Sequence, residues 1–504
     1  MVATTDITTA DGVVRGHLGR RVLRWRSLPY AAAPLGDLRF RAPQPVLPWA
    51  GVRDATVFGP AAMQHRSGAR IGPRRYQPTS EDALTLNVVA PVERSATPRP
   101  VMVFIHGGGY LIGTSALGLY SGSRLAVGGD VIVVSLNYRL GAFGYVDFGE
   151  FGTPERPFDA NLGLRDQVAA LQWVQRNIAA FGGDPGNVTI FGESAGAHAV
   201  LSLLATPAAK GLFHRGIAQS PPADWAMNAE NARAFARRCI ERLGATPDTA
   251  AKALITAGAN DIRRAVDQTS GQVLREHPGL FPIGPVVDGD YLPQAPVDAI
   301  ADGTAHRLPL IIGTNRDEGT LFAKFADELP TTPGRLHTLL TRAGGEELES
   351  RVIAAYPGYP DPKIAVRAGG DYVFWRPSVT TMAGHSRHAP TYAYRYDFAP
   401  RALYLAGIGA THASDLIPVF GAADSPFGRA LTAAGGRRGL LSVTRQFQDN
   451  WLEFARTGRP LPSWPAYTEE RRTTLIIDEI TRLENDPDKA KRIAWQGIQV
   501  PTLI

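Results

Sequence analysis

The segment that decides the fold reads Asn187-Val188-Thr189-Ile190-Phe191-Gly192-Glu193-Ser194-Ala195-Gly196. A β-branched and aromatic run ends in Gly-x-Ser-x-Gly, and an alanine-rich stretch from Ala195 to Ala205 follows it. This order predicts a nucleophile elbow, in which a strand turns sharply into a helix with Ser194 at its apex. Because such a turn is strained, we expect a side chain at Gly192 or Gly196 to collide with the neighbouring strand or helix.

A glycine run upstream of the elbow supplies a second motif. Val101-Met102-Val103-Phe104-Ile105 reads as a buried parallel strand, and His106-Gly107-Gly108-Gly109-Tyr110 follows it directly. Three glycines alone are more typical of a flexible surface turn. Between a strand and a serine elbow they can turn their amides towards a reacting carbonyl, whose oxyanion needs preorganised N–H donors. We therefore expect an oxyanion hole formed by the amides of Gly108, Gly109 and Ala195.

With these two motifs the chain resembles the type-B carboxylesterases, the group that includes bacterial para-nitrobenzyl esterases and the cholinesterases. Further segments similar to this family occur in order along the chain, and they are Leu28-Pro29-Tyr30-Ala31, Leu38-Arg39-Phe40, Glu81 to Val88, Asn137 to Gly141, Asn161 to Gln167, Trp451 with Phe454, and Trp464-Pro465. The resemblance implies the α/β-hydrolase fold, with a central, mostly parallel sheet flanked by helices, an N-terminal antiparallel ribbon and large helical insertions around the active-site cleft. It also implies one large domain over residues 1–504.

The pattern of the chain agrees with that architecture. Residues 12–50 read as short strands and turns, and from Val101 to about Ala205 strands alternate with helical segments, as in a parallel sheet. Residues 225–280 and 320–390 read as largely helical and are expected on the lid side of the cleft. Tyr392 to Tyr396 returns to a strand, and Trp451 to Thr457 is expected on a helix.

The resemblance indicates the remaining catalytic residues. In Asp317-Glu318-Gly319 the family's acid is the glutamate, and in Thr411-His412-Ala413-Ser414-Asp415 the histidine is His412. The order Ser194, Glu318, His412 is the order expected of this fold. Ser220, near the acid, and Asp415, three residues after the histidine, are carried over as supporting residues.

The residues alone leave alternatives open, because the chain contains eleven histidines. His198 lies one helical turn after the serine and could reach it, although a structural role is expected. His106 is expected to orient the glycine loop, and Asp317 is the main rival for the acid. His385 and His388 have a spacing seen in metal sites, but no cysteine or acidic cluster accompanies them, so we interpret them as a solvated loop pair and expect no metal.

These motifs predict a serine carboxylesterase that works through an acyl-enzyme and needs no cofactor. The loop from Ala62 to Ala83 carries Arg66, Arg70, Arg74 and Arg75 and no tryptophan. Cholinesterases use a tryptophan there to hold a quaternary ammonium. We therefore expect neutral or mildly acidic esters with short to medium acyl groups. Amide or carbamate cleavage by the same triad stays open. The non-catalytic reading, as in the cholinesterase-like adhesion proteins, is disfavoured because every catalytic position is filled.

Charge and cysteine content indicate which partners and which cellular compartment to expect. The net charge is +6, with 53 basic and 47 acidic residues, but the basic residues are scattered and no nucleic-acid-binding motif occurs. The only cysteine is Cys239, and the family's common cysteine pair is replaced by Ala62 and Ala83, as a reducing compartment permits. The intervening loop is expected to be mobile. The N-terminus lacks signal-peptide features and no apolar run is long enough to span a membrane, so we expect a cytoplasmic protein.

Overall fold

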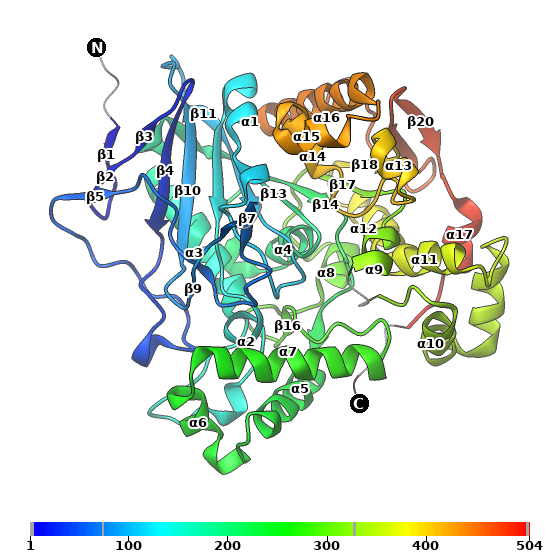
Figure 1. Cartoon of the computed structure of the whole chain (residues 1–504), viewed down its shortest axis with the longest axis horizontal. Coiled ribbons are helices and arrows are strands. Elements are labelled where there is room, and N and C mark those ends of the chain that lie inside the picture. Colours follow the sequence, from blue (N-terminus) through cyan, green and yellow to red (C-terminus); the bar gives the residue numbers. More distant parts are fainter. Residues whose placement is uncertain (1–4, 73–74, 326–328, 500–502, 504) are drawn as a thin grey trace.

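The core of the structure is an eleven-stranded mixed sheet with the order β20-β19-β18-β17-β14-β13-β11-β12-β10-β4-β3 (Figure 1). This computed structural model describes residues 5–72, 75–325, 329–499 and 503. The inner strands are mutually parallel, and they are β12 (Ile132–Leu136), β11 (Arg99–Ile105), β13 (Gly183–Glu193), β14 (Arg215–Gln219), β17 (Leu310–Asn315), β18 (Thr391–Tyr396) and β19 (Thr473–Ile477). The antiparallel edge strands are β10 (Thr85–Pro91), β4 (Val22–Pro29), β3 (His17–Leu18) and β20 (Arg482–Asn485).

The N-terminal ribbon is antiparallel in part. β1 (Asp6–Thr8) pairs antiparallel with β2 (Val13–Arg15), but β5 (Val52–Asp54) runs parallel to β2. The chain between β2 and β5 passes through β3 and β4 and a long loop, which is enough chain for a parallel return. The predicted antiparallel ribbon is thus present in β1–β2 and in β3–β4, and β5, which begins beyond residue 50, adds one parallel strand.

Helices cover both faces of the sheet. Alternate side chains of β11 point to opposite faces, as a strand requires. Val101, Val103 and Ile105 join the core under α3 (Leu162–Asn177) and α4 (Ala195–Leu204). Met102 and Phe104 join the core under α1 (Ser123–Gly129), α14 (Leu416–Val419) and α16 (Arg437–Thr457). Burial on both sides explains why this strand reads as a continuous apolar run.

The predicted helical insertions are confirmed. The first contains α5 (Ala229–Arg242), α6 (Pro247–Thr256) and α7 (Ala259–Glu276), which lie together at the bottom of Figure 1. The second contains α9 (Gly319–Phe325), α10 (Pro333–Ala354), α11 (Pro362–Gly370), a π-helix (Asp371–Trp375) and α12 (Arg376–Ser386). A separate apolar core joins this insertion to the C-terminal α17 (Lys489–Ala494), with Trp495 buried in it. Other short helices are α2 (Gly141–Gly144), α8 (Pro296–Asp302), α13 (Arg401–Leu405) and α15 (Pro426–Leu431). Within the described residues, three small strand pairs lie outside the main sheet, and they are β6 (Ala61–Ala62) with β9 (Thr79–Ser80), β7 (Arg70–Gly72) with β8 (Arg75–Tyr76), and β15 (Met227–Asn228) with β16 (Val286–Val287).

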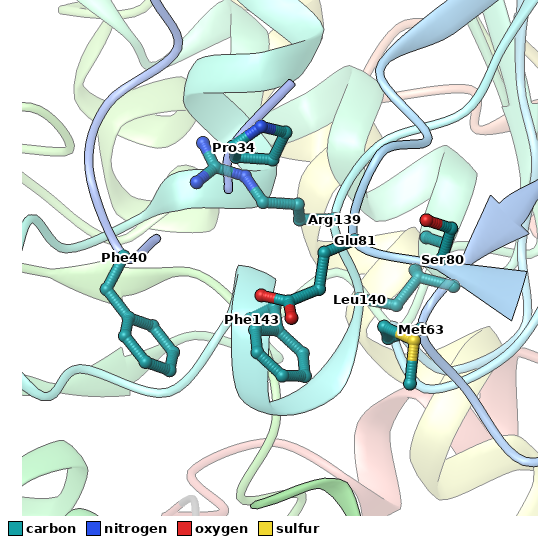
Figure 2. A pocket seen from close by; sticks show the side chains of 9 residues that line it. Pro34, Phe40, Met63, Ser80, Glu81, Arg139, Leu140 and Phe143 are labelled. Carbon is teal, nitrogen blue, oxygen red and sulfur yellow. The ribbon is translucent and has the colours of Figure 1, made fainter. Parts of the chain in front are cut away.

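The loop from Ala62 to Ala83 is closed at its neck without a disulfide. β6 (Ala61–Ala62) pairs with β9 (Thr79–Ser80), and both Ala62 and Ala83 are buried. Arg39 donates to the two carboxylate oxygens of Glu81 at 2.8 and 2.5 Å. Figure 2 shows a small cavity beside Glu81, and none of the predicted site residues lines it. Its volume is about 10 Å³, room for roughly one water. Greater mobility of this loop stays a prediction, and Arg74 lies outside the described residues.

A buried ion pair ties the sheet to the helix layer. Arg139 follows β12, and its Nε and Nη2 donate to Asp166 of α3 at 2.8 and 2.7 Å, while its backbone N–H donates to the same carboxylate at 3.0 Å. The two side chains are 4% and 0% exposed.

Replacing one member of this pair should strongly destabilise the fold. We expect Asp166→Ala to lower the free energy of unfolding by about 3–5 kcal/mol, because the guanidinium stays buried without its counter-charge. Thermal or denaturant unfolding measures the change. Asp6→Ala breaks an exposed pair with Arg15 and is the control, expected to leave the midpoint unchanged. Equal midpoints for both variants would contradict the account.

Candidate active site

The predicted elbow is present at the carboxyl end of β13. The strand ends at Glu193 and α4 begins at Ala195, with Ser194 between them at φ 59° and ψ −127°. A Cβ on Gly192 would run into the carbonyl of Gly196, and a Cβ on Gly196 would run into the carbonyl of Ile105. The expectation that neither glycine can carry a side chain is confirmed. The Ser194 N–H donates to the Gln219 carbonyl at 2.9 Å, which fixes the apex to β14.

The glycine loop that follows β11 packs directly against the elbow. A Cβ on Gly107 would lie 2.5 Å from the Glu193 carbonyl oxygen and 3.0 Å from Ser194 Cβ. Gly108 and Gly109 have φ values of 111° and 62°, so the loop has left-handed backbone where glycine is favoured. The structure thus brings the glycine loop, with Gly108 and Gly109, beside the start of α4, where Ala195 lies.

His106 anchors the start of this loop, as expected from the sequence. Its Nδ1 lies 2.8 Å from the Gly107 carbonyl oxygen, and its ring stacks on Tyr138 at 4.6 Å between centroids. The Tyr138 hydroxyl donates to the His106 carbonyl at 2.7 Å. Burial lowers the pKa of His106 to about 4, so the ring is neutral at physiological pH.

The histidine and the acid predicted from the resemblance lie in contact. His412 Nδ1 is 2.7 Å from Glu318 Oε2. The other oxygen of Glu318 accepts hydrogen bonds from the Ser220 hydroxyl at 2.6 Å and from the Asn315 N–H at 2.7 Å. Glu318, 2% exposed, is therefore held at both oxygens in an orientation that faces the imidazole.

The other acidic residues near this pair have different partners. Asp317 accepts hydrogen bonds from the Ala410 N–H at 3.0 Å and from Arg316. Asp415 is fully buried and accepts hydrogen bonds from Gln219 at 2.8 Å and from the Tyr394 hydroxyl at 3.0 Å. Asp317, the sequence rival for the acid, thus binds the segment before the histidine rather than the imidazole.

Glu193, which the sequence analysis did not single out, also lies against His412. Its Oε1 is 3.1 Å from His412 Nε2, and this contact lacks the alignment of a hydrogen bond, so among the described residues neither atom has a hydrogen-bond partner. The signal available in the sequence was an acidic residue at the end of a β-branched and aromatic run, directly before the serine.

The surrounding charges favour a proton on the His412–Glu193 pair. Burial disfavours the charged imidazole, but the charges of Glu193 and Glu318, the hydrogen bond to Glu318 and the charge of Asp415 outweigh it and raise the pKa of His412 to about 9. Burial raises the pKa of Glu193 to about 8, against the opposing charge of His412. One imidazole is therefore surrounded by three carboxyl groups in a buried environment.

Aromatic rings hold the imidazole from the insertion side. Phe374, in the π-helix, stacks on His412 with 4.2 Å between ring centroids, and Phe322 of α9 lies at 5.1 Å. Neither residue was predicted, because the sequence pattern does not show which member of Tyr372-Val373-Phe374-Trp375 a π-helix turns towards the site.

A larger cavity is lined by residues near the glycine loop but not by the loop itself. Its volume is about 400 Å³, and Trp225 lines it with Leu280, Phe281, Tyr372 and Val373, together with Asn228, Asn231 and Gln294. A Cβ on Gly109 would lie 3.7 Å from the tip of the Trp225 indole. Trp225 thus lines this cavity and also lies next to the glycine loop.

The other histidines are placed away from a metal-binding arrangement. His385 is 3% exposed at the end of α12, with Nδ1 2.7 Å from Thr391 Oγ1, so its interpretation as part of a solvated loop is wrong. Helix α12 extends to Ser386 and packs against β18, which buries His385 at the end of the helix. His388 contacts the Ala301 carbonyl. In the described part of the chain no group of three or more histidine, cysteine or acidic side chains could hold a metal.

Two further predictions about residue environment can be compared with the structure. Cys239 lies on α5, and burial raises the pKa of its thiol to about 12, which agrees with an inert residue. No helix within the described ranges combines the length and apolarity required to cross a bilayer.

Known proteins match this chain over nearly its whole length. The model of the carboxylesterase family matches residues 3–495. The para-nitrobenzyl esterase of Bacillus subtilis (strain 168) is 40% identical over 491 residues, covering 96% of this chain and 97% of that protein. The phenmedipham hydrolase of Pseudarthrobacter oxydans is 33% identical over 493 residues, covering 95% and 96%. A solved structure of a PNB esterase superposes with a TM-score of 0.86 at 38% identity, covering 98% of this chain and 99% of that one.

The sheet order, the elbow and the glycine loop are thus found in a chain that matches one family over nearly its whole length. The chain belongs to the carboxylesterase family, has the α/β-hydrolase fold and is a carboxylic ester hydrolase.

Proposed function

We propose that Ser194, His412 and Glu318 form the catalytic triad, and that the amides of Gly108, Gly109 and Ala195 form the oxyanion hole. The observation that carries this proposal is the 2.7 Å contact between His412 Nδ1 and Glu318, whose second oxygen is occupied by Ser220 and Asn315. A carboxylate fixed in this way sets the tautomer in which Nε2 is the base. The strained serine at the end of β13 supports the role of nucleophile.

In this mechanism neutral His412 removes the Ser194 proton as Oγ attacks the ester carbonyl. The tetrahedral oxyanion accepts hydrogen bonds from the backbone amides, and the imidazolium that forms faces Glu318. The imidazolium then protonates the leaving alcohol. Water repeats the sequence on the acyl-enzyme and releases a carboxylic acid. Asp415, held by Gln219 and Tyr394, adds a negative charge behind the histidine.

The substrate class that we propose is a neutral or mildly acidic ester with a short to medium acyl group. A cavity of about 400 Å³ with an aromatic wall at Trp225 and Phe281, next to the glycine loop, supports this size. The absence of tryptophan from the Ala62–Ala83 segment supports esters other than those of choline. We propose further that residues 1–504 act as one catalytic domain without a metal, and that the protein works in the cytoplasm, where a chain with a single cysteine needs no disulfide.

The nucleophile is tested with p-nitrophenyl esters from acetate to octanoate and with the matching anilides. Ser194→Ala should lower turnover of the esters by roughly 10⁴–10⁶-fold, because the covalent step is lost. The chain length that gives the highest kcat/KM sizes the acyl site, and the anilides separate ester from amide cleavage. Ser350→Ala, an exposed position on α10, is the control and should retain full activity. Retained activity in Ser194→Ala would exclude this serine as the nucleophile.

The charge around the base is tested by the pH dependence of kcat/KM. The base works when neutral, so activity falls as the pH drops through its pKa. Glu193→Gln removes one of the charges that raise the pKa of His412, so the acid limb should move to lower pH. Asp317→Asn is the matched control and should leave the limb in place, because Asp317 faces Ala410 and Arg316. A limb that moves to higher pH, or stays fixed in Glu193→Gln, contradicts the account.

A further inference from the structure

The residue directly after the glycine run has an unfavourable backbone conformation. Tyr110 has φ 57°, so left-handed backbone continues from Gly108 and Gly109 into an aromatic residue. Residues with a Cβ rarely adopt this region, and such strain persists only where the surroundings fix it. Something must therefore hold Tyr110 if the two preceding amides are to keep their directions.

Three of its contacts fix both the backbone and the side chain. The Tyr110 carbonyl accepts a hydrogen bond from the Gly141 N–H at 2.7 Å, and its ring packs on Tyr145 with 4.2 Å between centroids. The third contact joins two elements, because the Tyr110 hydroxyl lies 2.8 Å from His198 Nδ1 on α4. Both residues are fully buried, with exposed fractions of 0%.

His198 is part of the helix that starts at the elbow. Its N–H donates to the Ser194 carbonyl at 2.9 Å, so it is one rigid turn from the serine. Burial lowers the pKa of His198 to about 3, so the ring is neutral at physiological pH. Among the described residues its Nε2 has no partner, and the Trp225 ring lies 6.5 Å away. Within the described ranges the one hydrogen-bond partner of the ring is therefore Tyr110.

We propose that the Tyr110–His198 hydrogen bond is a positioning device that clamps the glycine loop to the nucleophile helix. It bridges the two elements whose backbone amides, at Gly108 and Gly109 on one and at Ala195 on the other, must converge on one oxyanion. The inference rests on the proposed function, because it concerns the oxyanion hole named there. His198 acts through Tyr110 and does not touch the substrate.

The tests are Tyr110→Phe and His198→Leu. Each should lower kcat by roughly 10- to 100-fold, because the oxyanion donors remain but lose their alignment. This decrease is smaller than, or about equal to, the decrease in kcat caused by removing one oxyanion donor. KM should change by less than about twofold, since the lost interaction belongs to the transition state. A trifluoromethyl ketone, which forms a tetrahedral adduct on a catalytic serine, should lose affinity by the same factor as kcat/KM.

Two comparisons separate positioning from general destabilisation. His198→Gln keeps a side-chain amide that can bond the tyrosine and should restore much of the activity. The double variant Tyr110→Phe/His198→Leu leaves no unpaired polar group, so its melting temperature should recover relative to the single variants while its kcat stays low. Tyr30→Phe is the matched control, because it removes a buried tyrosine hydroxyl that donates to the Asn137 carbonyl and leaves the Tyr110–His198 hydrogen bond intact. It should keep the wild-type kcat.

The outcomes distinguish this inference from the proposed function. If Tyr110→Phe and His198→Leu keep the wild-type kcat while Ser194→Ala is inactive, the clamp is refuted and the triad stands. Equal losses in His198→Gln and His198→Leu, or a kcat that recovers together with stability in the double variant, also refute it. If Ser194→Ala stays active, the proposed function fails and the inference fails with it.

Discussion

The turn at Ser194 is the constraint on which the rest of the site depends. β13 must end and α4 must begin within one residue, and the space beside Gly192 and Gly196 is filled by backbone. The carbonyl of Ile105, the last residue of β11, fills part of it, so the glycine loop that follows β11 is forced against the serine. β14 holds the apex from the other side through the Ser194–Gln219 hydrogen bond. Tight strand packing thus fixes the position of the serine and the position of the glycine loop, which supplies two amides of the proposed oxyanion hole.

The charges of the site oppose its burial. Glu193, Glu318 and Asp415 surround His412, and burying them is unfavourable unless each finds hydrogen bonds or a counter-charge. Glu318 and Asp415 are satisfied by neighbouring side chains, whereas among the described residues Glu193 Oε1 has no hydrogen-bond partner and faces the imidazole. The arrangement favours a positive imidazole, which is the species that the proposed mechanism forms when the serine loses its proton. The same negative charge that stabilises this intermediate also binds the proton that inactivates the base, so we expect the pH dependence to be the property most sensitive to Glu193.

Some residues of the site could be predicted from the sequence, and others could not. The elbow and the glycine loop could be predicted because their steric requirements are local and fall on adjacent residues. His412 and Glu318 lie 94 residues apart, and nothing local separates His412 from the other histidines, so they were found only through the family resemblance. Glu193, Phe374 and the Tyr110–His198 pair became visible only in three dimensions. The solvated interpretation of His385 failed for the same reason, because burial of a helix end depends on the strand it packs against.

The central claim is that Ser194 is the nucleophile, and covalent labelling tests it most directly. The protein is treated with an organic fluorophosphonate, the remaining esterase activity is followed, and the labelled peptide is identified by mass spectrometry. The account predicts one phosphonyl group per chain, attached to Ser194, with activity lost in proportion to labelling. Stoichiometric labelling of a different residue, or full activity in protein labelled at Ser194, would contradict it.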